Sequence, residues 1–178
     1  LFTTKAQYLP LRVPFSAAAV SLLRVLGLAD NRGQIKPSMR GKYDQVNALL
    51  RAVEPLLPET PPAQFTVVDC GCGKAYLTLA LHRYLVCAKG WRQVRIIGID
   101  KNESVVNSAR EMANALGIGD EVTFQACTIN EAELPKEPNI KRMDTSLAII
   151  SVLAVFSAFV DSKECAEILD GVLSPATI

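Results

Sequence analysis

The sequence has little imbalance of charge and few aromatic side chains. It carries 19 basic and 18 acidic residues, a formal net charge of +1, and aromatic residues make up 6% of its 178 positions. A charge near zero provides no molecule-wide field that would attract nucleic acid or an anionic membrane. Few rings are available on which unpaired bases could stack. These features argue against a generally basic nucleic-acid-binding protein.

Cysteine and histidine are too few and too badly spaced for a disulfide framework or a zinc site. The 5 cysteines are an odd number in a chain that can bury its own core, so we expect reduced thiols and a cytoplasmic location, with an organelle left open. Cys70 and Cys72 form C-x-C rather than C-x-x-C, and no second pair follows at ligand spacing. The only histidine, His82, is expected at the surface or at a helix end. The sequence therefore predicts no metal site.

No apolar run is long enough to cross a bilayer. The longest, Leu147 to Val160, falls short of the roughly 20 residues that a spanning helix needs, and we interpret it as a buried strand or helix. With 49% hydrophobic residues the chain is too apolar for intrinsic disorder, and its length is typical of one globular domain. Because the sequence begins at Leu1, a removed targeting segment is left open.

Hydrophobic periodicity predicts helices first and a strand–helix alternation afterwards. Apolar residues at helical spacing indicate helices between Ala17 and Leu26 and between Lys42 and Leu57. From Phe65 onward, short β-rich runs alternate with helical patterns. We expect strands over residues 65–69, 94–100, 122–127 and 147–152, and helices over residues 74–85 and 104–116. Residues 87–93 are expected to form a loop.

This alternation predicts an α/β fold, a Rossmann-like three-layer sandwich with a mainly parallel sheet in the strand order 3-2-1-4. We expect a helical N-terminal segment over residues 1–60, followed by the sheet domain over residues 61–178.

The most informative segment joins the first predicted strand to the next helix. Gly71 and Gly73 stand where the chain must turn sharply, and glycine there permits positive φ and close approach of a ligand to the backbone. The phosphate-binding pattern G-x-x-x-x-G-K-[ST] fails, because Val68 and Ala75 occupy two of its positions. The dinucleotide fingerprint fails because the bulky Tyr76 stands where a small residue is needed. What remains is a D-x-G-x-G loop.

A carboxylate follows the second predicted strand. Asp100 is expected at the carboxyl edge of the sheet beside the glycine loop, where it can accept both ribose hydroxyls of a nucleoside. The alternative is that Asp100 only caps the next helix through Asn102 and Glu103. The loop and the acid together favour a nucleoside-containing cofactor.

These two elements resemble a known family. Asp69-Cys70-Gly71-Cys72-Gly73 followed by Gly98-Ile99-Asp100 looks like motif I and the following acid of class I S-adenosylmethionine-dependent methyltransferases. With the segments 36–39 and 42–47, the region from Lys36 to Asn130 is similar to a methyltransferase-domain group that has a D-x-G-x-G-K-x-Y-L-[ST] loop.

The resemblance implies S-adenosyl-L-methionine as cofactor and a role for each matching residue. Gly71 and Gly73 would shape the backbone around the methionine part, and Asp69 would anchor the loop. Asp100 would hold the ribose, while Thr128 stands where many relatives carry an acid that contacts the adenine amine. The implied cofactor-binding residues are Asp69, Gly71, Cys72, Gly73, Tyr76, Asp100, Lys101, Asn102 and Thr128.

After Asp144 the chain departs from the family pattern. The run 147–156 is apolar, with Ser151 its one polar side chain and Ser157 just beyond it, and three further strands would need about 60 more residues. We therefore expect a sheet that is incomplete at the C-terminus, in a form truncated or diverged after the fourth strand. No side chain qualifies as a general base, because Tyr76, His82 and Glu131 all read as structural. The loop cysteines lack the partner base that a nucleophile needs.

These observations leave two functional hypotheses from different classes. The first is a methyltransferase that acts on an unidentified acceptor, and the alternative is a catalytically inactive binding or scaffold module that keeps the cofactor fold. An NAD-dependent enzyme is a third reading, which Tyr76 disfavours. The only local run of charge has two readings, a solvated helix face or an edge for an RNA acceptor. Its residues are Arg32, Lys36, Arg40 and Lys42.

Overall fold

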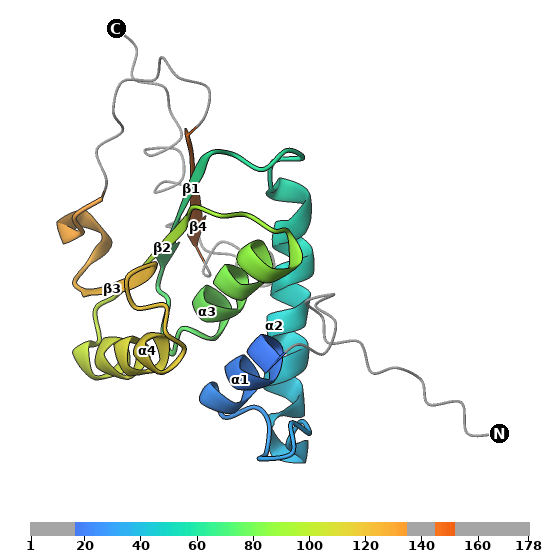
Figure 1. Ribbon diagram of the computed structural model, residues 1–178. Coiled ribbons are helices and arrows are strands. Elements are labelled where there is room, and N and C mark those ends of the chain that lie inside the picture. The colour runs from blue at the N-terminus through green and yellow to red at the C-terminus, as the bar shows by residue number, and fades with distance from the viewer. Residues whose placement is uncertain (1–16, 135–144, 152–178) are drawn as a thin grey trace, which may run out of the picture.

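The computed structural model describes residues 17–134 and 145–151, and its centre is a four-stranded parallel sheet (Figure 1). The strands are β1 (Gln64–Cys70), β2 (Val94–Asp100), β3 (Val122–Ala126) and β4 (Thr145–Ser151), in the order β3-β2-β1-β4. β1 pairs with both β2 and β4, so that Val67 stands opposite Ile96 on one side and Ala148 on the other. The predicted parallel sheet and its strand order are confirmed.

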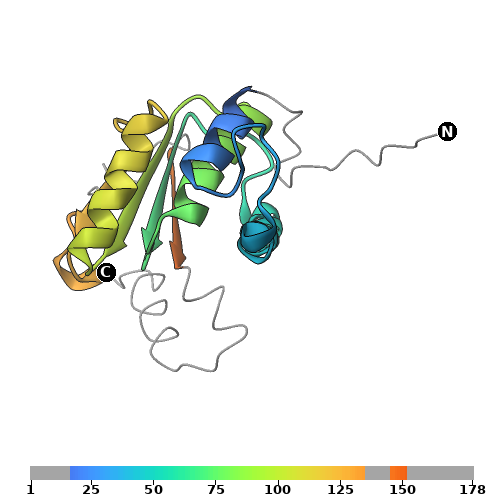
Figure 2. The same cartoon turned by 90° about the horizontal axis from the view of Figure 1, so that it is seen from below.

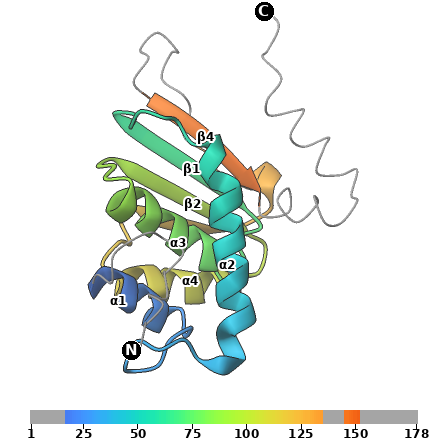
Figure 3. The ribbon, with the colours of Figure 1, turned by 90° about the vertical axis from the view of Figure 1, so that its right-hand side faces the viewer.

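Helices connect the strands and cover one face of this sheet. α3 (Tyr76–Arg83) leads from β1 toward β2, and α4 (Glu103–Ala115) leads from β2 to β3. α1 (Ala17–Val25) and α2 (Arg40–Val53) both pack against α3. Figure 3 shows α1, α3 and α4 on the same side of the strands, and Figure 2 shows α2 beside α1 and α3. The main hydrophobic core therefore runs from β1 and β2 through α3 into the N-terminal helices.

The two faces of the sheet bury different side chains, as the alternation of a strand requires. Phe65 and Val67 of β1 belong to the core beneath the helices. Val68 and Cys70 of the same strand join Ile99 of β2 in a second, smaller cluster. All five side chains are buried. β1 is thus covered on both faces, which is typical of a central parallel strand.

Three predicted details differ from the structure. The predicted surface position of His82 is wrong, because its side chain is 0% exposed, although the residue does lie in the last turn of α3. Its Nε2 lies 2.8 Å from Glu121 Oε2. The helix expected from residue 74 begins at Tyr76, because Ala75 adopts left-handed backbone at φ +55°. The start of the expected loop 87–93 is helical, because a π-helical turn spans Tyr84–Ala88.

The shorter helical turns are Pro37–Met39, Glu54–Leu56 and Ile129–Glu131. Within the ranges 17–134 and 145–151, no helix has both the length and the apolar character needed to cross a membrane. Ser157 and the expected incompleteness of the sheet concern positions beyond residue 151, outside the described residues.

Candidate functional site

The glycine loop is a rigid turn between β1 and α3 that is bound to the neighbouring strand. Gly71 has φ +76° and Gly73 has φ +52°, both in the left-handed region that favours glycine. The N–H groups of Gly71 and Cys72 donate to the carbonyl of Ile99 at 2.8 Å and 3.0 Å. Ala75 closes the turn with its N–H bonded to the Cys72 carbonyl. The loop is therefore held in one shape at the carboxyl end of the sheet.

Asp69 lies beneath this loop and is 2% exposed. The hydroxyl of Thr78, on α3, donates to its Oδ2 at 2.5 Å, while Oδ1 makes no hydrogen bond. Burial, aided by the negative charge of Asp100, raises the pKa of Asp69 to about 6. Asp69 thus joins the end of β1 to α3 from inside the protein.

Asp100, at the end of β2, faces the loop directly. Its Oδ2 accepts the N–H of Gly73 at 3.0 Å, and its Oδ1 accepts the N–H of Asn102 at 2.9 Å. The residue that caps α4 is Asn102, whose side chain accepts the N–H of Val105. A carboxylate at this place therefore spans the glycine loop and the start of the next helix, and it is not itself the helix cap.

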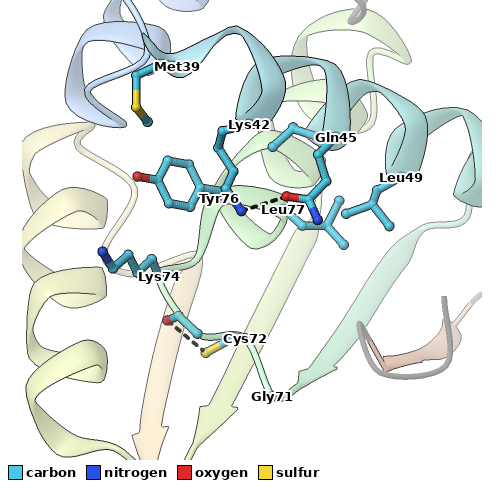
Figure 4. A pocket seen from close by; sticks show the side chains of 11 residues that line it. Met39, Lys42, Gln45, Leu49, Gly71, Cys72, Lys74, Tyr76 and Leu77 are labelled. Atoms are coloured by element: carbon cyan, nitrogen blue, oxygen red, sulfur yellow. Dashed lines mark hydrogen bonds between the residues drawn. The ribbon is translucent and has the colours of Figure 1, made fainter. Parts of the chain in front are cut away.

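Two cavities meet at Gly71. The first, of about 430 Å³, lies between the ends of β2 and β3, and its lining includes Asp100, Lys101 and Thr128. The second, of about 470 Å³, lies between the glycine loop and α2 (Figure 4). Because Gly71 lines both cavities, one elongated ligand can pass over its backbone from the first into the second.

The structure brings most of the predicted cofactor residues to these two cavities. Gly71, Asp100, Lys101 and Thr128 line the first. The second is lined by the loop and the start of α3, namely Gly71, Cys72, Gly73 and Tyr76. Asp69 and Asn102 are not among the lining residues of either cavity. Their contacts support the loop and α4 instead.

The sequence prediction did not include α2 in the site. Met39, Lys42, Gln45 and Leu49 line the second cavity from the side opposite the glycine loop (Figure 4). The spacing of three or four residues between the last three places them on one face of the helix. That spacing was visible in the sequence, but nothing local to residues 39–49 indicates which surface the face covers.

Thr128 forms a local turn at the edge of the first cavity. Its hydroxyl donates to Glu131 Oε2 at 2.7 Å, and its N–H donates to the same atom at 3.0 Å. These two bonds lower the pKa of Glu131 below its ordinary value. The Thr128 oxygen also accepts the backbone N–H of Glu131 in this capping box, which leaves it one lone pair for an incoming donor.

The loop cysteines are ill suited to nucleophilic chemistry. Burial raises the pKa of the Cys72 thiol to about 12, and the charges of Asp69 and Asp100 add to the effect. Burial also raises the pKa of Cys70. Both side chains are thiols rather than thiolates at neutral pH. Among the described residues, no group of three or more His, Cys, Asp or Glu is arranged to hold a metal ion.

The four basic residues of the predicted edge have different surroundings. All four side chains are exposed, and the Arg40 guanidinium lies 6.0 Å from the centroid of the Tyr43 ring. Lys42 alone among them lines the second cavity, with its ammonium 5.5 Å from the centroid of the Tyr76 ring. The run is therefore not a uniform basic strip.

A comparison with protein families places this fold and loop in a known group. The sequence model of a methyltransferase-domain family matches residues 41–166, which include α2 except for its first residue, the glycine loop, Asp100 and all four strands. The chain belongs to this methyltransferase-domain family. The predicted class is confirmed. The finer D-x-G-x-G-K-x-Y-L-[ST] grouping stays a prediction.

Among curated proteins no significant match is found. Solved structures that resemble the chain include a geranyl diphosphate C-methyltransferase from Streptomyces coelicolor A3(2), in complex with Mg²⁺, geranyl diphosphate and S-adenosyl-L-homocysteine. It is 18% identical, with a TM-score of 0.40 over 67% of this chain and 50% of that chain. An O-methyltransferase from Bacillus cereus in complex with SAH is 17% identical, with a TM-score of 0.37 over 64% and 44%. The METTL16 MTase domain is 15% identical, with a TM-score of 0.37 over 63% and 46%. The chain spans about half the length of these proteins.

Proposed function

We propose that the chain binds S-adenosyl-L-methionine across the glycine loop and transfers its methyl group to an acceptor. One observation carries the proposal, namely the Asp100 carboxylate bonded to the Gly73 N–H with a cavity on each side of Gly71. Membership of a methyltransferase-domain family supports it. The structures of a C-methyltransferase and an O-methyltransferase that resemble the chain contain S-adenosyl-L-homocysteine or SAH.

The first cavity suits the adenosine half of this cofactor. A carboxylate has about four lone-pair sites, and the N–H groups of Gly73 and Asn102 use two of those on Asp100. The other two can accept the ribose hydroxyls. Ile99 and Ile129 provide apolar lining for the adenine, and the Thr128 oxygen can accept a hydrogen bond from its amine.

The second cavity suits the methionine half. Gly71 and Gly73 have no side chain, so the ligand can approach the loop backbone closely. Tyr76, at the first turn of α3, and Lys42 of α2 lie on the rim of the same space (Figure 4). The residues present therefore fit both halves of the cofactor.

The chemistry asks little of the protein beyond positioning. The bound sulfonium supplies an already activated methyl group, so the site has to align it with an acceptor and exclude water. His82 is buried against Glu121 and lines neither cavity, and the Cys72 thiol is neutral at pH 7. We therefore assign no described side chain as general base, so an acceptor that loses a proton on methylation has to release that proton to solvent.

We propose RNA as one acceptor class to be tested, because Lys36 and Arg40 are exposed on the approach to α2. The alternative function is an inactive scaffold that retains the cofactor site. Transfer of a labelled methyl group from S-adenosyl-L-methionine to bulk RNA or to a protein extract distinguishes the two. Label in RNA supports an RNA methyltransferase. Label in protein alone supports a different acceptor, and cofactor binding without transfer supports the scaffold.

Isothermal calorimetry with S-adenosyl-L-homocysteine and with NADH tests the cofactor itself. We expect saturable binding of the first and none of the second, because Tyr76 occupies the position where a dinucleotide site needs a small residue. Binding of NADH, or the absence of binding by S-adenosyl-L-homocysteine, would contradict the proposal. Circular dichroism on the same sample shows that the protein is folded.

A further inference from the structure

The second cavity has an uneven charge that the proposed function does not explain by itself. Its lining contains two ammonium groups, those of Lys42 and Lys74, and no acidic side chain. The first cavity contains the carboxylate of Asp100. A ligand that extends over Gly71 therefore meets an acceptor of hydroxyl groups at one end and a positively charged wall at the other.

Lys42 is held in place by two contacts. Its ammonium donates to Gln45 Oε1 at 2.6 Å and lies 5.5 Å from the centroid of the Tyr76 ring. Among the described residues it has no carboxylate within 4.0 Å. An ammonium has three N–H donors, so two remain after the bond to Gln45. Lys42 is thus oriented at the cavity with unused donors.

Lys74, the second lysine that lines this cavity, is less firmly held than Lys42. It extends from the loop away from Lys42 and Gln45 (Figure 4), and its side chain is exposed. In the described part of the chain it has neither a hydrogen-bond partner nor an aromatic ring beside it. Lys42 is therefore the better-fixed of the two cations.

We propose that Lys42 binds the carboxylate of the amino-acid part of S-adenosyl-L-methionine, so that α2 closes the methionine end of the site. This inference rests on the proposed function, since it names a further binding residue for the same ligand. The amino-acid part enters the second cavity once adenosine occupies the first, because Gly71 is the shared wall. Lys42 presents a cation to its carboxylate there, and the ordering of Lys42 by Gln45 and Tyr76 reduces the entropy lost on binding.

The test uses two ligands that differ only in the carboxylate, S-adenosyl-L-homocysteine and its decarboxylated form, S-adenosyl-3-thiopropylamine. A charge-assisted hydrogen bond of about 1.5–3 kcal/mol corresponds to a loss of roughly 10- to 150-fold in affinity. We expect Lys42→Gln to weaken binding of S-adenosyl-L-homocysteine by that factor. We expect it to change binding of the decarboxylated ligand by less than about threefold, a difference below 1 kcal/mol.

Lys36→Gln is the matched control, because it removes the same charge from an exposed lysine that does not line the cavity. It should leave both affinities unchanged. Equal weakening of both ligands by Lys42→Gln, or no weakening of either, overturns the role of Lys42 while the cofactor site stands. If the wild-type protein binds neither ligand, the proposed function fails and this inference fails with it. Thermal melting of each variant confirms that the exposed substitution leaves the fold intact.

Discussion

At the scale of single residues, the site depends on two acids that have different tasks. Asp100 is partly exposed and bonds the loop through the Gly73 N–H. Asp69 is buried, and one of its oxygens makes no hydrogen bond. In the sequence both are ordinary aspartates, and nothing there distinguishes the buried one from the partly exposed one. The difference in burial comes from α3, which covers Asp69 and supplies the Thr78 hydroxyl.

The raised pKa of Asp69 makes a prediction for stability. The pKa is 3.8 in an unfolded chain and about 6 in the folded protein. The folded state thus binds the proton more tightly, so this contribution is fully present below pH 3.8 and is lost as the pH rises through about 6. A shift of this size corresponds to about 3 kcal/mol. Asp69→Asn should remove that part of the pH dependence.

Urea unfolding of wild type and Asp69→Asn at pH 4.5 and pH 7.5, on the order of one pH unit or more to each side of the folded pKa, measures the effect. The free energy of unfolding of the wild type, minus that of the variant, should be larger at the lower pH. His82 has the opposite sign, because burial lowers its pKa and protonation below its ordinary 6.5 costs stability. It is present in both proteins, so it cancels in the comparison. A difference that does not vary with pH would contradict the buried, titrating Asp69.

At the scale of elements, the contact between β2, β3 and the glycine loop is unusually close. A Cβ added at Gly98 of β2 would lie 2.5 Å from the Phe124 ring of β3 and 3.0 Å from Cys72 Sγ. Such distances require these buried groups to move. The glycine is thus a packing requirement that sets how near the loop and the edge strand approach.

Gly98→Ala should therefore destabilise the fold by about 1–3 kcal/mol, the usual cost of overpacking a core. Gly41→Ala is the control, because nothing lies within 4 Å of its added Cβ and the residue is inside α2. It should stabilise the protein by about 0.5–1 kcal/mol through the lower entropy of the unfolded chain. Denaturant unfolding of both variants checks the pair. Equal effects of the two substitutions would show that the crowding at Gly98 is absent in solution.

The sequence predicted most elements because their signals are local. Strand runs such as Val94–Asp100 and the helix stop at Gly117, which has φ +67°, are visible in a short window. The position of α2 is not local. Whether Lys42 faces solvent or the glycine loop depends on how α2 packs on α3, more than 30 residues along the chain. The burial of His82 is not local either, because its imidazole lies against Glu121, which is distant in the sequence.

At the scale of the whole molecule, the fold places all of this chemistry at one edge. The parallel strands end together, so the loop after β1 and the acid after β2 meet at that edge, and β4 lies on the other side of β1. That meeting follows from strand order, which the alternation of strands and helices predicted. The assignment of residues 1–60 and 61–178 to separate units stays a prediction. The family match begins at residue 41, inside α2.

The central claim is that Asp100 holds the ribose of a bound cofactor, and titration of S-adenosyl-L-homocysteine into Asp100 variants tests it most directly. Asp100→Ala removes charge-assisted bonds worth about 1.5–3 kcal/mol, so affinity should fall roughly 10- to 150-fold. The affinity of Asp100→Asn, which keeps one oxygen acceptor, should lie between those of the wild type and Asp100→Ala. Urea unfolding of the same variants should show a loss of only about 1 kcal/mol, since the bond from the Asn102 N–H is exposed and the bond from the Gly73 N–H is only partly buried. Unchanged affinity together with a clear loss of stability would make Asp100 a structural residue of the loop and contradict the site.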